Sequence, residues 1–197
     1  VNDKFVPLTY FNIVKLNAGE QFHYKVSGYE TCIVPATGTI DVEVIGQTYE
    51  AVGNRKVDVW GGEPEAVYVP VGIEAKFTCI TDNTEVFIAG AKYDKVLKPF
   101  VVRVAELDLV QYGSDETKTH RKIKHILGQK QANQVGRLLV SELFTVGQGG
   151  WSGFPSHKHD TNRLPEETRH DETYNFRFKP NYGSGLQMLQ REENKSG

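Results

Sequence analysis

Residues 30–45 read ETCIVPATGTIDVEVI and give the clearest sign of secondary structure in the chain. Two runs within them, Cys32–Pro35 and Thr39–Ile45, are rich in β-branched residues, which fit the pleated surface of a sheet. Between the runs lies Ala36–Gly38, whose glycine is typical of a turn. We therefore expect two short strands joined by a turn.

The same composition recurs through the first hundred residues. Turn residues such as Gly61–Pro64 and Thr81–Asn83 separate three further expected strands: Ala66–Pro70, Ala75–Ile80 and Thr84–Ala89. No helical period lies between these runs. Short strands at this spacing indicate a sandwich or a barrel, so the sequence predicts an all-β fold.

A second β-rich part begins near residue 136. The pattern restarts over residues 137–146, and farther on Tyr174, Phe176 and Phe178 fall on one face of an extended tail. The residues between the two parts look different: 91–110 predict an extended connection with one or two strands, 111–120 a polar loop, and 121–134 at most a short helical or turn element.

These patterns divide the chain into three predicted parts. They are a barrel over residues 1–100, a connector over 101–135 and a second β module over 136–197. Both β-rich parts have the same rhythm, which suggests a duplicated barrel. The second part is short for a barrel like the first, so we expect it to be incomplete in this chain.

Charge and composition exclude several classes of protein. The 197 residues carry a formal net charge of −2 and 24% are charged, so there is no general basic excess of the kind that nucleic-acid binding shows. No run approaches the roughly 18 apolar residues of a membrane span. We expect neither nucleic acid nor membrane as a partner.

The two cysteines, Cys32 and Cys79, lie in apolar, β-branched runs. Free cysteine behaves as a small hydrophobic residue, so we expect two buried thiols. A disulfide would require the strands to bring the pair within reach. A cytoplasmic location is the expectation for such a chain.

The chemistry of the chain is concentrated in residues 149–178 (GGWSGFPSHKHDTNRLPEETRHDETYNFRF). His157 and His159 form a His-x-His pair, and residues two apart on a strand point to the same side. A carboxylate at the head of a neighbouring strand, Glu172, could reach the same ion. Two imidazoles and one carboxylate suit zinc, manganese, iron, nickel or cobalt and leave positions open for substrate.

Other residues in this segment are rival or additional candidates. Glu167 and His170 compete with Glu172 as the third ligand. We favour Glu172 because its position at the start of a strand would be fixed by pairing. Three arginines, Arg163, Arg169 and Arg177, could bind a substrate carboxylate through a bidentate fork.

The strings GGWSGFPSHKHD (149–160) and LPEETRHDETYNFRF (164–178) resemble the signature of the 5-deoxy-glucuronate isomerase family of inositol catabolism. That family is similar to 4-deoxy-L-threo-5-hexosulose-uronate ketol-isomerase of pectin breakdown. The resemblance extends over most of the chain, through residues 30–44, 53–70 and 121–128.

The resemblance implies a bicupin, with two jelly-roll barrels and a metal in the second. His157, His159 and Glu172 match the family's ligands, and a further family histidine would lie beyond Gly197. In the first barrel Ala75 stands where a ligand histidine would be expected, so we expect no metal there. Zinc is the favoured ion, with manganese or iron as alternatives.

The implied reaction is an aldose–ketose isomerisation of a deoxy uronic acid, from 5-deoxy-glucuronate to 5-dehydro-2-deoxy-gluconate. It needs a base, an acid and an electrophile. Glu167 and Tyr174 are candidates for the proton-transfer groups, and Arg177 for the residue that holds the substrate carboxylate. The resemblance also implies a homo-oligomer. The alternatives are an iron-dependent cupin dioxygenase and a non-catalytic sugar-binding or structural cupin.

Overall fold

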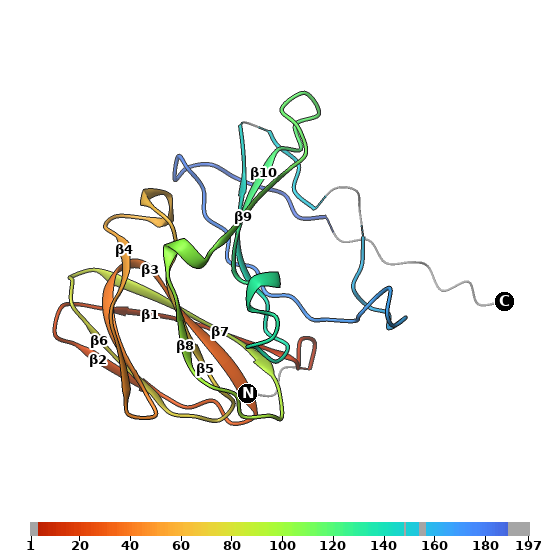
Figure 1. Cartoon of the computed structure of the whole chain (residues 1–197). Coiled ribbons are helices and arrows are strands. Elements are labelled where there is room, and N and C mark those ends of the chain that lie inside the picture. Colours follow the sequence, from red (N-terminus) through yellow and green to blue (C-terminus); the bar gives the residue numbers. More distant parts are fainter. Residues whose placement is uncertain (1–3, 148, 154–156, 189–197) are drawn as a thin grey trace.

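The structure is a computed structural model that describes residues 4–147, 149–153 and 157–188 (Figure 1). Its regular secondary structure consists almost wholly of antiparallel strands. They are β1 (Thr9–Leu16), β2 (Gln21–Tyr24), β3 (Tyr29–Val44), β4 (Gln47–Arg55), β5 (Ala66–Val69), β6 (Ala75–Cys79), β7 (Thr84–Lys92), β8 (Phe100–Val102), β9 (Asp108–Tyr112), β10 (Arg121–Leu127) and β11 (Val140–Thr145). Three short 3-10 helices, η1 (Val59–Gly61), η2 (Val104–Glu106) and η3 (Gln129–Gln131), complete the elements.

Strand β3 is one continuous strand, so the prediction of two strands joined by a turn at residues 36–38 was wrong. Its first half pairs with β5 and β7, and its second half pairs with β4 and β6. The register shifts between Pro35 and Thr37 and again between Gly38 and Ile40. Such irregularities bend a strand. The small residues therefore mark the place where β3 passes from one sheet to the other.

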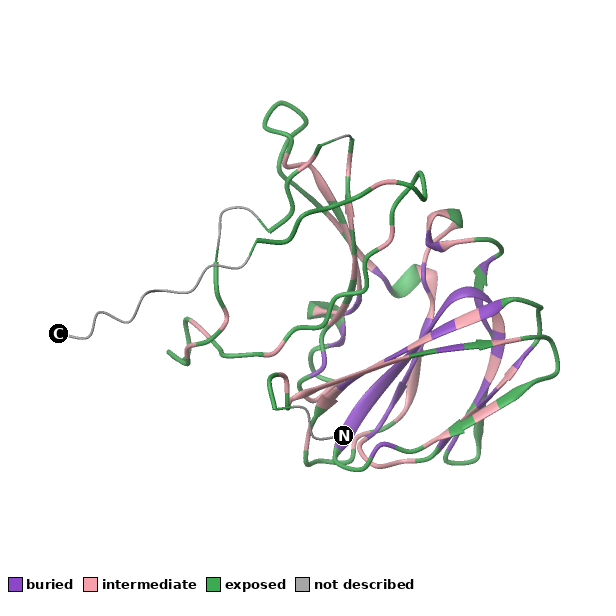
Figure 2. Cartoon of the chain, turned by 180° about the vertical axis from the view of Figure 1, so that it is seen from behind, coloured by how far each residue is buried: buried purple, intermediate pink, exposed green. Residues whose placement is uncertain are grey.

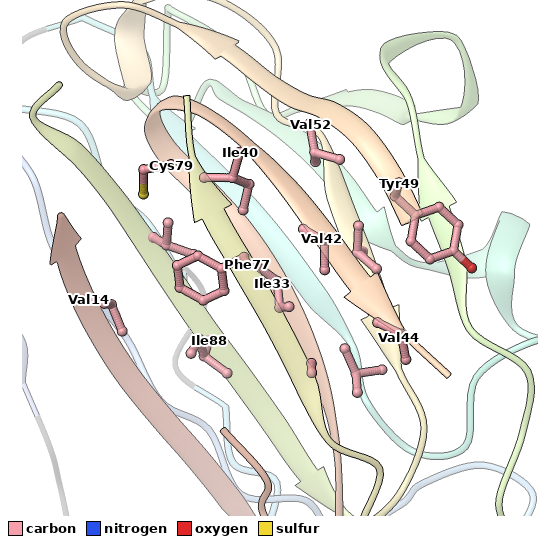
Figure 3. Close-up of a cluster of buried hydrophobic side chains, with 14 residues drawn as sticks. Val14, Ile33, Ile40, Val42, Val44, Tyr49, Val52, Phe77, Cys79 and Ile88 are labelled. Carbon is pink, nitrogen blue, oxygen red and sulfur yellow. The ribbon is translucent and has the colours of Figure 1, made fainter. Parts of the chain in front are cut away.

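The two sheets that share β3 close around an apolar core. One sheet runs β1-β7-β3-β5-β8, and the other adds β2, β6 and β4 to the second half of β3. Side chains at alternate positions meet inside, as Figure 3 shows for Ile33, Ile40, Phe77 and Ile88, all of which are fully buried. Ala75 is part of this core. The interior of the first barrel is therefore packed with apolar side chains.

Three strands of this barrel, β1, β2 and β4, were not expected from the sequence. Strand β4 includes Gly53 and Asn54, which resemble a turn, yet Arg55 beyond them pairs with Gly38 of β3. Gly53 has a φ of 93°, and a Cβ atom there would lie 2.7 Å from the carbonyl oxygen of Gly38. The glycine is thus needed for a close approach of two strands.

The second sheet is a meander of β9, β10 and β11. Residues 121–127 form its central strand, so the prediction of a helical or turn element over 121–134 was wrong for that range. Ile123 of β10 lies opposite Val110 of β9 and Leu143 of β11. Residues 101–135 therefore supply two of the three strands of this sheet.

A second apolar core joins this sheet to the outer face of the first barrel. Cys32, Val34 and Tyr68 of the barrel pack in one cluster with residues of the second half, namely Leu107, Ile126, Leu127 and Leu138. Figure 2 accordingly shows buried residues, in purple, both in the barrel and at the end of β10. The two halves of the chain thus share a continuous packed interface.

The two cysteines lie in different cores. Cys32 belongs to the cluster between the barrel and the second half, whereas Cys79 belongs to the barrel interior. Both are free and buried, and desolvation raises the pKa of each thiol. The sheet therefore separates the two sulfur atoms.

After β11 the described residues contain no strand, although the tail was expected to form one. The extended segment returns to the first barrel, where the backbone N–H of Leu8 donates to Asp171 at 2.9 Å and Thr173 hydrogen-bonds Thr9 at 3.1 Å. Tyr174 and Phe176 stack with ring centroids 5.7 Å apart. Tyr174 and Phe176 thus lie on one side, but all three aromatic side chains of the segment are exposed, and no described strand pairs with it. Among the described residues no helix is long and apolar enough to cross a bilayer.

Candidate metal centre

The candidate centre is formed where the chain folds back on itself between residues 157 and 172. The backbone N–H of His170 donates to the carbonyl oxygen of His159 at 3.0 Å, so the two ends of the fold-back run side by side. The loop between them is closed by a backbone bridge between Arg163 and Glu167. Arg169 N–H also donates to the side chain of Asn162 at 2.8 Å.

This fold-back gathers three imidazole rings. The centroids of His157 and His159 are 4.9 Å apart, and those of His159 and His170 are 3.9 Å apart. The rings of His157 and His159 stand edge to face, at 72°. His157 and His159 are therefore neighbours, as their spacing predicts, and His170 joins them from the opposite side of the fold-back.

Glu172 brings a carboxylate to the same place. Its Oε1 lies 3.8 Å from Nε2 of His159 and 3.8 Å from Nε2 of His170. One ligand atom from each of these three residues lies within 4.8 Å of the others. Donors bound tetrahedrally to zinc at about 2.1 Å lie about 3.4 Å apart, so small side-chain movements would fit these donors to an ion.

Two hydrogen bonds orient the donors. Nδ1 of His170 lies 3.1 Å from the carbonyl oxygen of Thr168, and the phenol of Tyr174 donates to Oε2 of Glu172 at 2.8 Å. Burial and this bond to Glu172 raise the pKa of Tyr174 to about 12. Tyr174 therefore keeps its proton at neutral pH and acts as a donor.

The other predicted site residues point elsewhere. Glu167 forms an ion pair with Arg163. Arg177 pairs with Glu85 and lies 3.7 Å from Asp58, so its guanidinium faces the first barrel. It lines an open pocket of about 320 Å³ there. Their roles in catalysis and substrate binding stay predictions.

His170 lies beside Glu172 and His159, a proximity that sequence reasoning missed. The signal was present, since His170 and Glu172 are two residues apart, like His157 and His159. In an extended chain this spacing places both side chains on one side. What was lacking was the register of the fold-back.

The chain is similar to a known protein family over its whole length. The model of the KduI/IolB family matches residues 1–197. The chain belongs to this family. It is 29% identical over 189 residues to a protein of Bacillus subtilis (strain 168) named 5-deoxy-glucuronate isomerase, covering 94% of this chain and 68% of that protein. A Shouchella clausii protein of the same name is 32% identical over 193 residues, with the same coverage.

A solved structure shows the same architecture. The crystal structure of an IolB-like protein from Salmonella typhimurium LT2 aligns with a TM-score of 0.71 and 26% identity. The alignment covers 82% of this KduI/IolB family chain and 59% of that one. The expectation of an all-β, cupin-type fold is confirmed. The chain spans about two thirds of the length of the curated relatives it matches.

Proposed function

We propose that the chain acts in the metal-dependent isomerisation of 5-deoxy-glucuronate to 5-dehydro-2-deoxy-gluconate in myo-inositol catabolism. The observation that carries the proposal is the convergence of His159 and Glu172, with His157 beside them, in a family whose curated members carry the name 5-deoxy-glucuronate isomerase. The substrate is then a small sugar acid.

The reaction shifts a proton between adjacent carbons through an enediol. A divalent ion, when bound, would supply the electrophile that stabilises the developing oxyanion. His157, His159 and Glu172 would hold it. This donor set suits zinc, which we favour, as well as manganese or iron.

The surrounding side chains would position these ligands and move protons. Tyr174 holds Oε2 of Glu172, which directs Oε1 towards the histidines. Because Tyr174 keeps its proton at neutral pH, it would offer a substrate oxygen a hydrogen bond, whereas a pKa of about 12 disfavours full transfer of that proton. Glu167 would serve as the base only after releasing Arg163, and Arg177 would bind a substrate carboxylate only after releasing Glu85.

Metal content and activity of the purified chain test the proposal together. We expect about one divalent ion per chain by elemental analysis and anaerobic conversion of 5-deoxy-glucuronate. The double variant His157→Ala/His159→Ala should lose both the ion and the activity. His23→Ala, an exposed histidine on β2 of the first barrel, is the matched control and should keep both.

Other results would favour other functions. Turnover that requires iron and O₂ would indicate a dioxygenase. Stoichiometric metal without turnover would indicate a sugar-binding or structural protein. Assembly into a homo-oligomer and a cytoplasmic location are further proposals, which size-exclusion chromatography with light scattering and cell fractionation would check.

A further inference from the structure

We infer that His170 is a metal ligand of this centre and binds the ion through Nε2. The inference rests on the proposed function in one respect, namely that His159 and Glu172 hold a divalent ion. The inference adds a second nitrogen donor, and this donor lies in the same fold-back as His159 and Glu172.

The first support is the direction of the imidazole ring. Nδ1 of His170 is 3.1 Å from the carbonyl oxygen of Thr168, which can only accept a hydrogen bond. Nδ1 therefore acts as the hydrogen-bond donor, so in the neutral ring Nε2 is the nitrogen that offers a lone pair. A ligating histidine ordinarily donates its other ring N–H to a carbonyl or a carboxylate in this way.

The second support is the place to which that lone pair is brought. Nε2 of His170 lies 3.8 Å from Oε1 of Glu172, and Nε2 of His159 lies at the same distance from the same oxygen. These distances are too long for hydrogen bonds, which end near 3.2 Å for N–H···O. They suit three donors arranged around a common ion.

The third support is that one short fold-back brings His159, His170 and Glu172 together. His159 and His170 face each other because the N–H of His170 bonds the carbonyl oxygen of His159. The side chains of His159, His170 and Glu172 are 33%, 46% and 41% exposed, so an ion can reach them from solvent. An ion bound to all three would tie together the two ends of the loop at residues 160–169.

Zinc titration of the full chain by isothermal calorimetry tests the inference. We expect His170→Ala to weaken zinc binding at least 10-fold, because losing even an outer partner of a ligand typically costs 10–100-fold in affinity. His23→Ala should change the affinity less than twofold. The double variant His157→Ala/His159→Ala reports separately on the centre itself.

Cobalt distinguishes a ligand from a residue that only positions one. The visible absorption of bound Co²⁺ depends on the number and type of its donors, so His170→Ala should change the band positions as well as the affinity. Unchanged bands with weaker binding would make His170 a positioning residue and overturn the inference.

Hydrogen exchange gives a third readout that needs no activity. Zinc should slow exchange of the His170 amide, which bonds His159 across the fold-back. This protection should be lost in His170→Ala, measured over residues 160–170.

The failures can be told apart. If His170→Ala binds zinc like the unaltered chain while the double variant loses it, the inference fails and the proposed centre stands. If the unaltered chain takes up no zinc, manganese or iron, the centre itself is refuted.

Discussion

At the residue scale, Glu30 shows how a buried carboxylate can join two parts of a chain. It is fully buried and accepts hydrogen bonds from the backbone N–H groups of Gly136, Arg137 and Leu138, at 2.9, 2.5 and 2.8 Å. The phenol of Tyr68 donates a further bond at 2.5 Å. A carboxylate provides acceptors only, so it matches a site that offers donors only.

Replacing Glu30 with Gln hardly changes the volume of the side chain, yet it should destabilise the fold. The amide NH₂ would face backbone donors, and leaving such groups unpaired costs about 3 kcal/mol. Urea denaturation followed by circular dichroism would measure the loss. Glu43→Gln is the control, since the exposed ion pair of Glu43 with Lys76 should contribute less than about 1 kcal/mol. Equal losses in both variants would contradict the role given to Glu30.

At the scale of the element, β3 depends on one glycine. Gly38 has a φ of 82° and lies so close to Thr84 that a Cβ atom would collide with the threonine side chain. Because glycine has no Cβ, it can adopt the left-handed conformation and approach Thr84 closely. Both allow β3 to bend from one sheet into the other. A larger residue at this position would strain the backbone and crowd Thr84, which would destabilise the bend.

Gly46 allows the two effects at Gly38 to be separated. It also has a positive φ, 72°, but no atom lies within 4 Å of the position its Cβ would take. Gly46→Ala should cost about 1 kcal/mol from backbone strain alone. Gly38→Ala should cost clearly more because the collision is added. Thermal unfolding of both variants would test this order, and a smaller loss for Gly38→Ala would refute it.

At the scale of the whole molecule, a buried ion pair links the first barrel to the second sheet. Arg55 of β4 is 1% exposed and donates from Nη1 to both oxygens of Glu142 of β11, at 2.8 and 2.9 Å. It also donates to the carbonyl oxygen of Pro35 at 2.8 Å. With Glu30, it fixes how the second half sits against the barrel.

Removing one member of this pair should be costly. Glu142→Leu leaves the buried guanidinium without a counter-charge, and breaking such a pair typically costs about 3–5 kcal/mol. The double variant Arg55→Met/Glu142→Leu should recover much of that loss because no buried charge remains. A double-mutant cycle by denaturant unfolding checks this. Additive effects of the two single changes would show that the pair is not coupled.

Local composition was enough to predict that the chain is rich in β-strands, but it did not predict several of the individual strands. Runs rich in Val, Ile and Thr, such as 66–70 and 84–89, form strands where expected. Polar strands such as β2 and β10 were missed because their stability comes from paired neighbours. The tail at residues 173–178 shows the converse, since its aromatic residues alternate in the sequence yet stay exposed and pair with no described strand. The three-part division of the chain stays a prediction.

The sequence alone determined the fold class and the closeness of His157 and His159, because these depend on residue type and on a spacing of two. Only the tertiary structure decided which partners meet. It brought His170 and Glu172 to His159, turned Arg177 towards Glu85, and placed Cys32 and Cys79 in separate cores. The physical reason is that backbone pairing between distant segments fixes the register of a fold-back, and no local pattern encodes that register.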